Sequence, residues 1–197
     1  MKTYFFVIKL KSFFKKSPSK IEVKNLQTNS KLTFNIKVNH LNFKYMEFTN
    51  KFDFIKGKRI DLIIQSKDGG NDKIIPFYYF SIVLHDTVCE VGKISLRIGH
   101  NHHSFFNGNI GYEVYEGYRG HNYAFEAIKT IVPLAIFHDM DYLILTCAAD
   151  NIPSKKTIEK TGAVFLKSVT PPSDYVFYFK DIPPYCIYRL NIKKEEL

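Results

Sequence analysis

Hydrophobic and polar residues alternate in the first part of the chain in a way that predicts strands. Between residues 31 and 38 every second residue, from Leu32 to Val38, is apolar, and this period of two is typical of a half-buried strand. Residues 61–65 and 78–84 are further apolar runs, separated by turn residues at 68–70. We expect these two runs to form strands as well.

From residue 88 onward the pattern predicts strands and helices in regular succession. The expected strands are 88–98, 109–114, 142–148, 163–169 and 185–192, and the expected helices are 123–137 and 152–161. A polar, His-rich loop is expected at 99–108, and Pro133 is expected to kink the first helix or open its last turn. The run 142–148 is apolar throughout, which is typical of a strand covered on both faces.

Composition and length narrow the class of protein. The chain has 197 residues, of which 45% are hydrophobic and 24% charged, which excludes a disordered or fibrous chain and favours one domain. Its 3 cysteines are far apart, with no C-x-x-C spacing, so we expect a reducing, cytoplasmic location and no zinc site. The apolar run 4–8 is too short for a signal peptide or a membrane span. No contact with a membrane is expected.

Positive charge is concentrated at one end of the chain. Residues 1–60 carry 14 Lys and Arg against 3 Asp and Glu, a balance of +11, so the remaining residues hold 28 − 14 = 14 against 19 − 3 = 16, a balance of −2. One hypothesis is that residues 1–60 bind nucleic acid or the ribosome through electrostatic attraction. The other is a solvated, Lys-rich face. The sequence leaves both open.

A glycine-containing turn before the helix at 123–137 is the first candidate for chemistry. The N-terminus of a helix exposes unpaired N–H groups and the positive end of the helix dipole, so it binds phosphates. Gly120 leaves room for such a group, and Arg119 carries a charge that can contact it. His121 and Asn122 complete the turn before Tyr123 and Ala124 open the helix. Two interpretations stay open on these residues alone: a phosphate-binding loop, or a glycine that serves only the turn between strand and helix.

Two segments resemble a known family. The stretch 111–127, GYEVYEGYRGHNYAFEA, and the stretch 151–165, NIPSKKTIEKTGAVF, are similar to the acetyl-CoA-binding core of the GNAT acetyltransferase superfamily, in particular the branch of ribosomal-protein N-terminal amine acetyltransferases. The matching positions are Ile110, Gly111, Tyr112, Arg119, Gly120, Tyr123, Ala124, Asn151, Ser154, Glu159, Lys160 and Gly162. The sequence departs from the family pattern at Asn122, where a second glycine is usual, at Ala163 and Val164 after Gly162, and at Ile158, where many members carry a tyrosine acid.

The resemblance implies a fold and a cofactor. The fold is α/β: a mixed, mostly antiparallel sheet with helices on both faces and a splayed pair of parallel strands, 109–115 and 142–148. The co-substrate is acetyl-CoA, without a metal. The resemblance implies that it binds through the residues Val114, Tyr115, Arg119, Gly120, His121, Asn122, Tyr123, Ala124, Asn151 and Lys156. Residues 1–197 are expected to form a single acetyltransferase domain, with a divergent basic part at 1–75 and the acetyl-CoA-binding core at 85–192.

The same resemblance implies roles in the reaction. Glu113 is the candidate base that takes a proton from the attacking amine, with Glu116 as second choice. Ser154 is the candidate that returns a proton to the departing thiolate. A backbone N–H near Val114 and Tyr115 would hold the oxyanion. An acceptor pocket is expected from Phe106, Tyr112 and Tyr175, with the histidines 100, 102 and 103 at its rim, where their spacing does not favour a metal.

The predicted function is transfer of acetyl from acetyl-CoA to a primary amine, either a protein N-terminus or a small amine, by direct attack. Two alternatives stay open: a non-catalytic acetyl-CoA-binding module, and an RNA- or ribosome-associated protein acting through its basic N-terminal segment. The chain is expected to be a monomer or a homodimer.

Overall fold

The computed structural model describes residues 22–24, 31–33, 47–71 and 73–192. The chain divides into two units, residues 1–44 and 45–197. In the first unit, β1 (Glu22–Lys24) pairs antiparallel with β2 (Lys31–Thr33). The rest of the strand expected at 31–38 and most of the basic residues in 1–60 lie outside the described residues.

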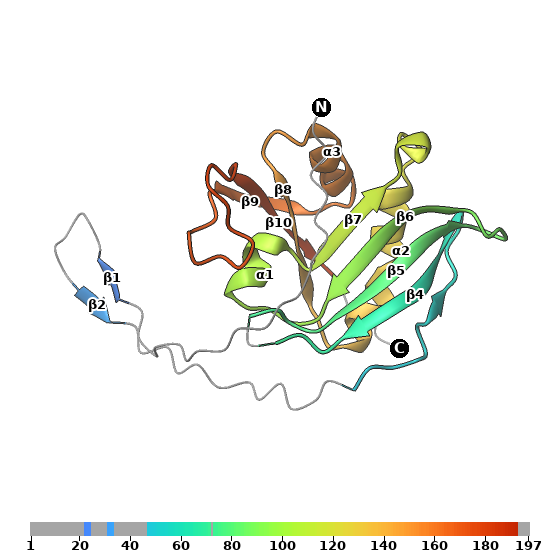
Figure 1. The fold of residues 1–197 in the computed structure, drawn as a ribbon, viewed down its shortest axis with the longest axis horizontal. Helices are drawn as coiled ribbons and strands as arrows, with labels where there is room; N and C mark the ends of the chain where they lie inside the picture. The colour runs from blue at the N-terminus through green and yellow to red at the C-terminus, as the bar shows by residue number, and fades with distance from the viewer. Residues whose placement is uncertain (1–21, 25–30, 34–46, 72, 193–197) are drawn as a thin grey trace. The chain divides into compact units, whose positions relative to one another are not determined.

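The second unit is built on one mixed sheet (Figure 1). Its strands are β3 (Phe54–Ile55), β4 (Ile60–Asp68), β5 (Phe77–Leu84), β6 (Glu90–Arg97), β7 (Ile110–Val114), β8 (Tyr142–Ala148), β9 (Val164–Val169) and β10 (Tyr185–Asn191). Their order in the sheet is β3-β4-β5-β6-β7-β8-β10-β9. All neighbours pair antiparallel except β7 and β8, which are parallel. The strands predicted from residue 61 onward are thereby confirmed.

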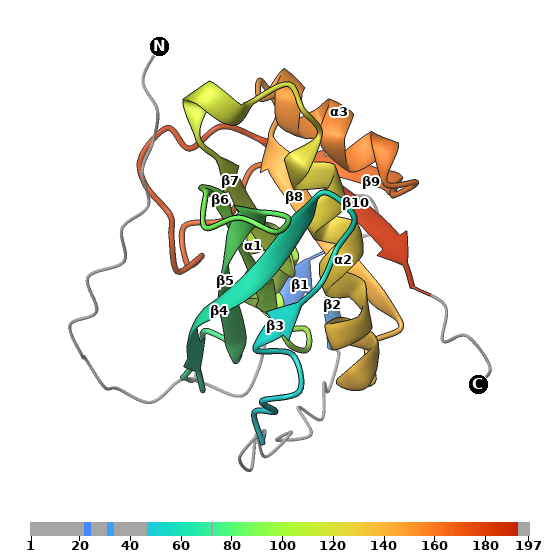
Figure 2. The same cartoon turned by 90° about the vertical axis from the view of Figure 1, so that its right-hand side faces the viewer.

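One face of this sheet is covered by α2 (Tyr123–Phe137), which packs against β4, β6 and β7. Figure 2 shows α2 and α3 (Ile152–Lys160) beside the sheet. The strands turn alternate residues to this face, so that Tyr78, Phe80 and Ile82 of β5 are fully buried. The helix contributes Ile128 and Ile131 to the same core. Burial of this apolar surface is the main stabilising term of the fold.

The other face of the sheet carries α1 (His102–Asn107), which packs against β8 and β10. The prediction of a loop over 99–108 was therefore wrong. Asn101 accepts a hydrogen bond from Ser104 N–H at 2.7 Å and donates its own N–H to Ser104 Oγ at 2.8 Å. This reciprocal cap starts the helix, and the buried ring of Phe106 fixes it to a small second core.

The strand β8 is buried on both faces, as its continuous apolar run predicted. Leu143 and Leu145 belong to the core under α2, while Ile144 is buried from the opposite side. The helix α2 has the predicted bounds and continues through Pro133 to Phe137. The structure is thus the predicted α/β fold with helices on both faces, and residues 60–84, mostly assigned to the divergent part, form two strands of the same sheet.

Candidate active site

The opening between β7 and β8 begins where their backbone pairing ends. Strand β7 pairs with β6 along its length, whereas it pairs with β8 only at Ile110 and Leu145. Tyr115 N–H also donates to Val91 O of β6 at 2.9 Å. Because backbone groups of alternate residues in a strand face alternate neighbours, Tyr112 and Val114 direct theirs away from β6, toward the opening. Two amides were expected to face the opening. Val114 N–H faces it, whereas Tyr115 N–H is hydrogen-bonded to β6.

The turn that leads from β7 into α2 has the backbone shape of an anion-binding loop. Gly120 has φ +86° and Asn122 φ +63°, both in the left-handed region that glycine and asparagine tolerate best. A Cβ added at Gly120 would meet no atom within 4 Å, so the glycine is needed for its conformation and the space in front of it is open. Tyr123 and Ala124 occupy the first turn of α2, whose N–H groups lack partners within the helix.

The side chain of Asn122, which departs from the family pattern, is held by the neighbouring helix. Lys160 Nζ of α3 donates to Asn122 Oδ1 at 3.0 Å. Asn122 makes no side-chain cap to α2. The replacement of the usual glycine is therefore accommodated by a left-handed backbone and a partner for the amide.

Arg119 and Arg59 fix the two ends of the turn. Arg119 Nε donates to Val114 O at 3.0 Å, and Arg59 Nη2 donates to His121 O at 2.8 Å. Arg59 also pairs with the Glu126 carboxylate through Nε at 2.6 Å and through Nη2. Arg59 was not among the predicted site residues. It belongs to the basic stretch 1–60, and no local pattern indicates that it returns to a loop more than sixty residues later.

Ser154 lies in the first turn of α3 and contacts a residue of β7. The N-cap Asn151 accepts a hydrogen bond from Ser154 N–H at 3.1 Å, so its side chain caps α3. Tyr112 Oη lies 2.7 Å from Ser154 Oγ. Burial raises the pKa of Tyr112 above its usual value, so the phenol keeps its proton at neutral pH. The two hydroxyls form a pair that can pass a proton.

Glu113 points to the opposite face of β7 from Tyr112, since successive side chains of a strand alternate. On this face it stands across from Lys93 of β6. Close by, the Glu90 carboxylate accepts short hydrogen bonds from the Ser81 and Tyr115 hydroxyls, and these bonds lower the pKa of Glu90. Burial, together with the bond to Glu90, raises the pKa of Tyr115. Sequence analysis did not single out Glu90, because only the pairing of β5, β6 and β7 brings it to Ser81 and Tyr115.

The three residues expected to line an acceptor pocket are divided by the sheet. Phe106 and Tyr175 pack together on the α1 face with ring centroids 5.6 Å apart, and both are nearly buried. Tyr112 instead packs against the core under α2 and bonds Ser154. The α1 face also carries His103, whose Nδ1 accepts a hydrogen bond from Val176 N–H at 3.3 Å.

The remaining predicted residues lie on α3 and in the turn. Lys156 and His121 are exposed, so neither is committed to the core. Ile158, at the position where many family members carry a tyrosine, is fully buried. Glu116 is exposed in a 3-10 turn at Glu116–Tyr118. The structure thus brings Arg119, Gly120 and Asn122 together at one end of the opening and Ser154 with Tyr112 on one side of it.

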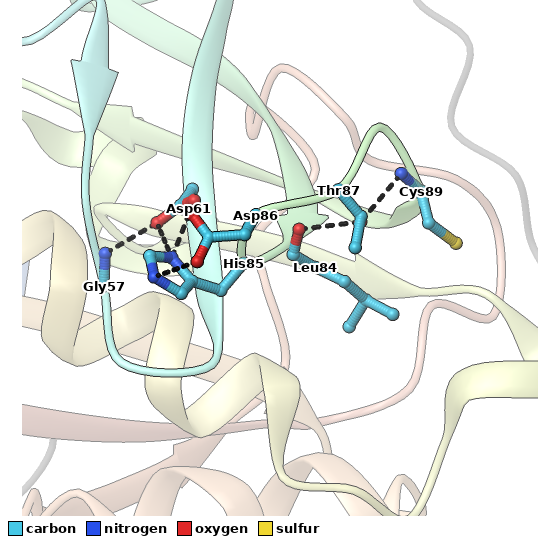
Figure 3. A network of polar contacts seen from close by, with 7 residues as sticks. All are labelled: Gly57, Asp61, Leu84, His85, Asp86, Thr87 and Cys89. Carbon is cyan, nitrogen blue, oxygen red and sulfur yellow. Dashed lines mark hydrogen bonds and ion pairs between the residues drawn. The ribbon is translucent and has the colours of Figure 1, made fainter.

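A buried polar network supports the hairpin that presents Arg59 (Figure 3). The Asp61 carboxylate accepts hydrogen bonds from Gly57 N–H at 3.0 Å and from His85 Nδ1 at 3.0 Å. Burial disfavours the charged form of Asp61, but these two hydrogen bonds outweigh it and lower the pKa below its usual value. The carboxylate therefore holds the turn before β4 and the end of β5 together.

No group of three or more His, Cys, Asp or Glu side chains in the described ranges is arranged to hold a metal ion. Within the same ranges, no helix is long and apolar enough to cross a membrane.

Comparison with known proteins places this geometry in a class. A mixed sheet with one splayed parallel pair, followed by a glycine-containing turn into a helix, is the arrangement that the resemblance implied. The family model described as "Acetyltransferase (GNAT) domain" matches residues 47–164. This match covers more than half of the chain. The chain belongs to the GNAT acetyltransferase family.

Solved structures agree at the level of the fold. An acetyltransferase of the GNAT family from Bacillus anthracis superimposes with a TM-score of 0.53 at 17% identity, over 70% of this chain and 98% of that one. A putative ribosomal-protein-serine acetyltransferase from Vibrio cholerae gives 0.52 at 17% identity, over 74% and 100%. For the microcin C7 self-immunity acetyltransferase the TM-score is 0.46 at 17% identity, over 59% of this chain and 61% of that one. No curated protein matches.

Proposed function

We propose that this chain transfers an acetyl group from acetyl-CoA to a primary amine. The observation that supports this most is the opening between β7 and β8, with the turn 119–122 at its end. An extended amide chain such as pantetheine can pair with the backbone of Tyr112 and with Val114 N–H, which face the opening, while the N-terminus of α2 receives the pyrophosphate. The microcin C7 self-immunity acetyltransferase is described in complex with acetyl-CoA, in keeping with this assignment.

The side chains on the two faces of β7 support direct attack. In our proposal the amine approaches on the Glu113 face, and Glu113 takes its proton, so that the nitrogen lone pair can form the new C–N bond. Val114 N–H stabilises the oxyanion. When the C–S bond breaks, Ser154, paired with Tyr112, donates a proton to the thiolate on the other face. The proton acceptor and the proton donor then stand on opposite sides of the thioester.

The acceptor and the location belong to the same proposal. We propose a protein N-terminus or a small amine, because the Vibrio cholerae protein is described as a putative ribosomal-protein-serine acetyltransferase. A reducing compartment, such as the cytoplasm, suits the three free cysteines. The further proposals are a single acetyltransferase domain over 1–197, a ribosome- or RNA-binding role for 1–60, and a monomer or homodimer in solution.

The test is an acetyl-transfer assay with the full chain, acetyl-CoA and a panel of peptides and small amines. We expect release of free CoA thiol that matches the amount of acetylated amine detected by mass. Glu113→Gln should lower the rate about 100-fold near neutral pH, in the range of general-base effects, and the deficit should narrow at higher pH as the free amine loses its proton without help. Glu116→Gln tests the second candidate base, and we expect it to leave the rate unchanged. Full activity in Glu113→Gln would exclude Glu113 as the base, and acetyl-CoA binding without transfer to any amine would favour a binding module.

A further inference from the structure

A half-buried arginine, Arg97, lies on the α1 face of the sheet, on the same side as Glu113. Arg97 is the last residue of β6, and Lys93, Ser95 and Arg97 turn their side chains to one face. A Cβ added at Gly111 would lie 3.3 Å from Arg97 Nη1 and 3.0 Å from Ser95 Oγ. The guanidinium therefore lies directly over Gly111 of β7, two residues before Glu113.

The partners of this guanidinium are all neutral. Nη1 donates to Gly108 O at 3.4 Å. With its amide oxygen turned toward the guanidinium, Asn107 accepts from Nε at 3.0 Å and from Nη2 at 3.3 Å. An arginine has five N–H donors, so two remain for another group. Among the described residues no ion pair joins Arg97 to a carboxylate.

A half-buried cation without an anionic partner loses part of its hydration and gains no counter-charge in return. Burial lowers the pKa of Arg97 to about 10, which still leaves the group charged at neutral pH. A carboxylate from a ligand would supply both the missing charge and acceptors for the two remaining N–H groups. Arginine is the residue best suited to this role, because its planar fork matches the geometry of a carboxylate.

The surroundings of Arg97 favour an anion. Arg97 lines a pocket together with Lys73, His103 and Asn107, so the charged side chains of that lining are basic. Burial lowers the pKa of His103, and the charge of the Asp174 carboxylate opposes this with a smaller effect. The Asp174 side chain is 75% exposed, and its Oδ1 lies 3.6 Å from His102 Nε2. Asp174 is thus at the solvent edge, beside another histidine, and leaves the charge of Arg97 unopposed.

The pocket is within reach of the reaction. Residues two apart in a strand are separated by roughly 7 Å, so the guanidinium over Gly111 stands about that far from Glu113 along the same face. An acceptor whose amine lies at Glu113 can extend along β7 and place a second group at Arg97.

We propose that this pocket binds a carboxylate of the acceptor, and that the protein acetylates amines whose carboxylate lies on the order of 7 Å from the nitrogen. The inference rests on the proposed function and names its substrate class. Two sources supply this chemistry: the acidic side chain of a second residue in a peptide, and the carboxylate of a small ω-amino acid.

The experiment compares matched acceptors with the full chain and acetyl-CoA. One pair is a peptide amide with Glu or Gln as second residue, and the other is aminohexanoate or its amide. We expect kcat/KM to favour the carboxylate member by about 10-fold or more, as for a hydrogen bond to a charged group. Preference within the first pair identifies a peptide acceptor, and preference within the second a small one.

Variants separate the role of Arg97 from general damage. Arg97→Gln should abolish the preference, measured as the ratio of kcat/KM for the two members of a pair, and Arg97→Lys should restore only part of it. The exposed Lys73→Ala should reduce the preference even if Arg97→Gln does not fold, and Lys129→Ala, an exposed lysine of α2, is the matched control. Equal use of both members by the wild type, or a preference that survives in Arg97→Gln, overturns this inference alone. Failure to acetylate any amine overturns the proposed function with it.

Discussion

At the scale of single residues, the two faces of β7 carry different parts of the proposed reaction. Glu113 stands across from Lys93 of β6, whereas Tyr112 packs against the core under α2, beside Ser154. A strand alternates its side chains by geometry alone. The separation of Glu113 from the Tyr112–Ser154 hydroxyl pair therefore follows because Tyr112 and Glu113 are neighbours in sequence.

The hydroxyl pair gives a prediction about coupling. Ser154→Ala and Tyr112→Phe should each lower kcat, while the double variant should be little worse than the more damaging single one, because residues that act as a unit are not additive. KM for acetyl-CoA should change less than kcat. If the two effects on kcat multiply, so that the coupling energy of the double-mutant cycle is zero, the two hydroxyls act separately.

The residue scale is also where sequence analysis stops. Glu113, Ser154 and the turn 119–122 could be proposed from the sequence because the motif is local. Arg59, Glu90 and Arg97 were missed because each acquires its partners through strand pairing or through contacts between distant segments. The same limit placed Tyr112 in a pocket with Phe106, since chain order does not show on which face of the sheet a helix packs.

At the scale of elements, the strands and the two longer helices could be predicted because each has a clear period. The helix α1 could not, because its six residues are too few to show a helical repeat. Its one signal is the cap between Asn101 and Ser104, which is visible in sequence only as a weak pattern. Residues 60–84 lie outside the motif, yet β4 and β5 complete the sheet that supports it.

The link between the β3–β4 hairpin and the turn 119–122 gives a second prediction. Arg59→Ala removes the hydrogen bond to His121 O and the ion pair with Glu126, so it should weaken acetyl-CoA binding several-fold, as expected for about 0.5–1.5 kcal/mol. Lys58→Ala, the exposed neighbour, is the control. A titration calorimetry experiment that gives equal affinity for both variants and the wild type would show that Arg59 does not hold the turn.

At the scale of the whole molecule, the buried network around Asp61 makes stability depend on pH. The pKa of Asp61 is lower in the folded state than the ordinary value of 3.8. The stabilisation is therefore present in full above that value and is lost as the pH falls through the lower, folded pKa.

Asp61→Asn should therefore destabilise the protein at neutral pH, by roughly 1–3 kcal/mol, and should flatten the decline of Tm between pH 5 and pH 2. Asp86→Asn, on an 83% exposed side chain that also contacts His85, should leave both unchanged. Denaturation curves across this range provide the measurement. An equally steep decline in Asp61→Asn would assign the acid sensitivity to other carboxylates.

The claim on which the account rests most is that the opening between β7 and β8, with its turn at 119–122, binds acetyl-CoA. The most direct measurement is a thermal-shift titration of the full chain with acetyl-CoA and with CoA. A ligand at about 100 times its dissociation constant stabilises the folded state by roughly 2.7 kcal/mol, so we predict a clear, saturable rise in Tm. The absence of any shift with either ligand would contradict the cofactor site and the transfer reaction built on it.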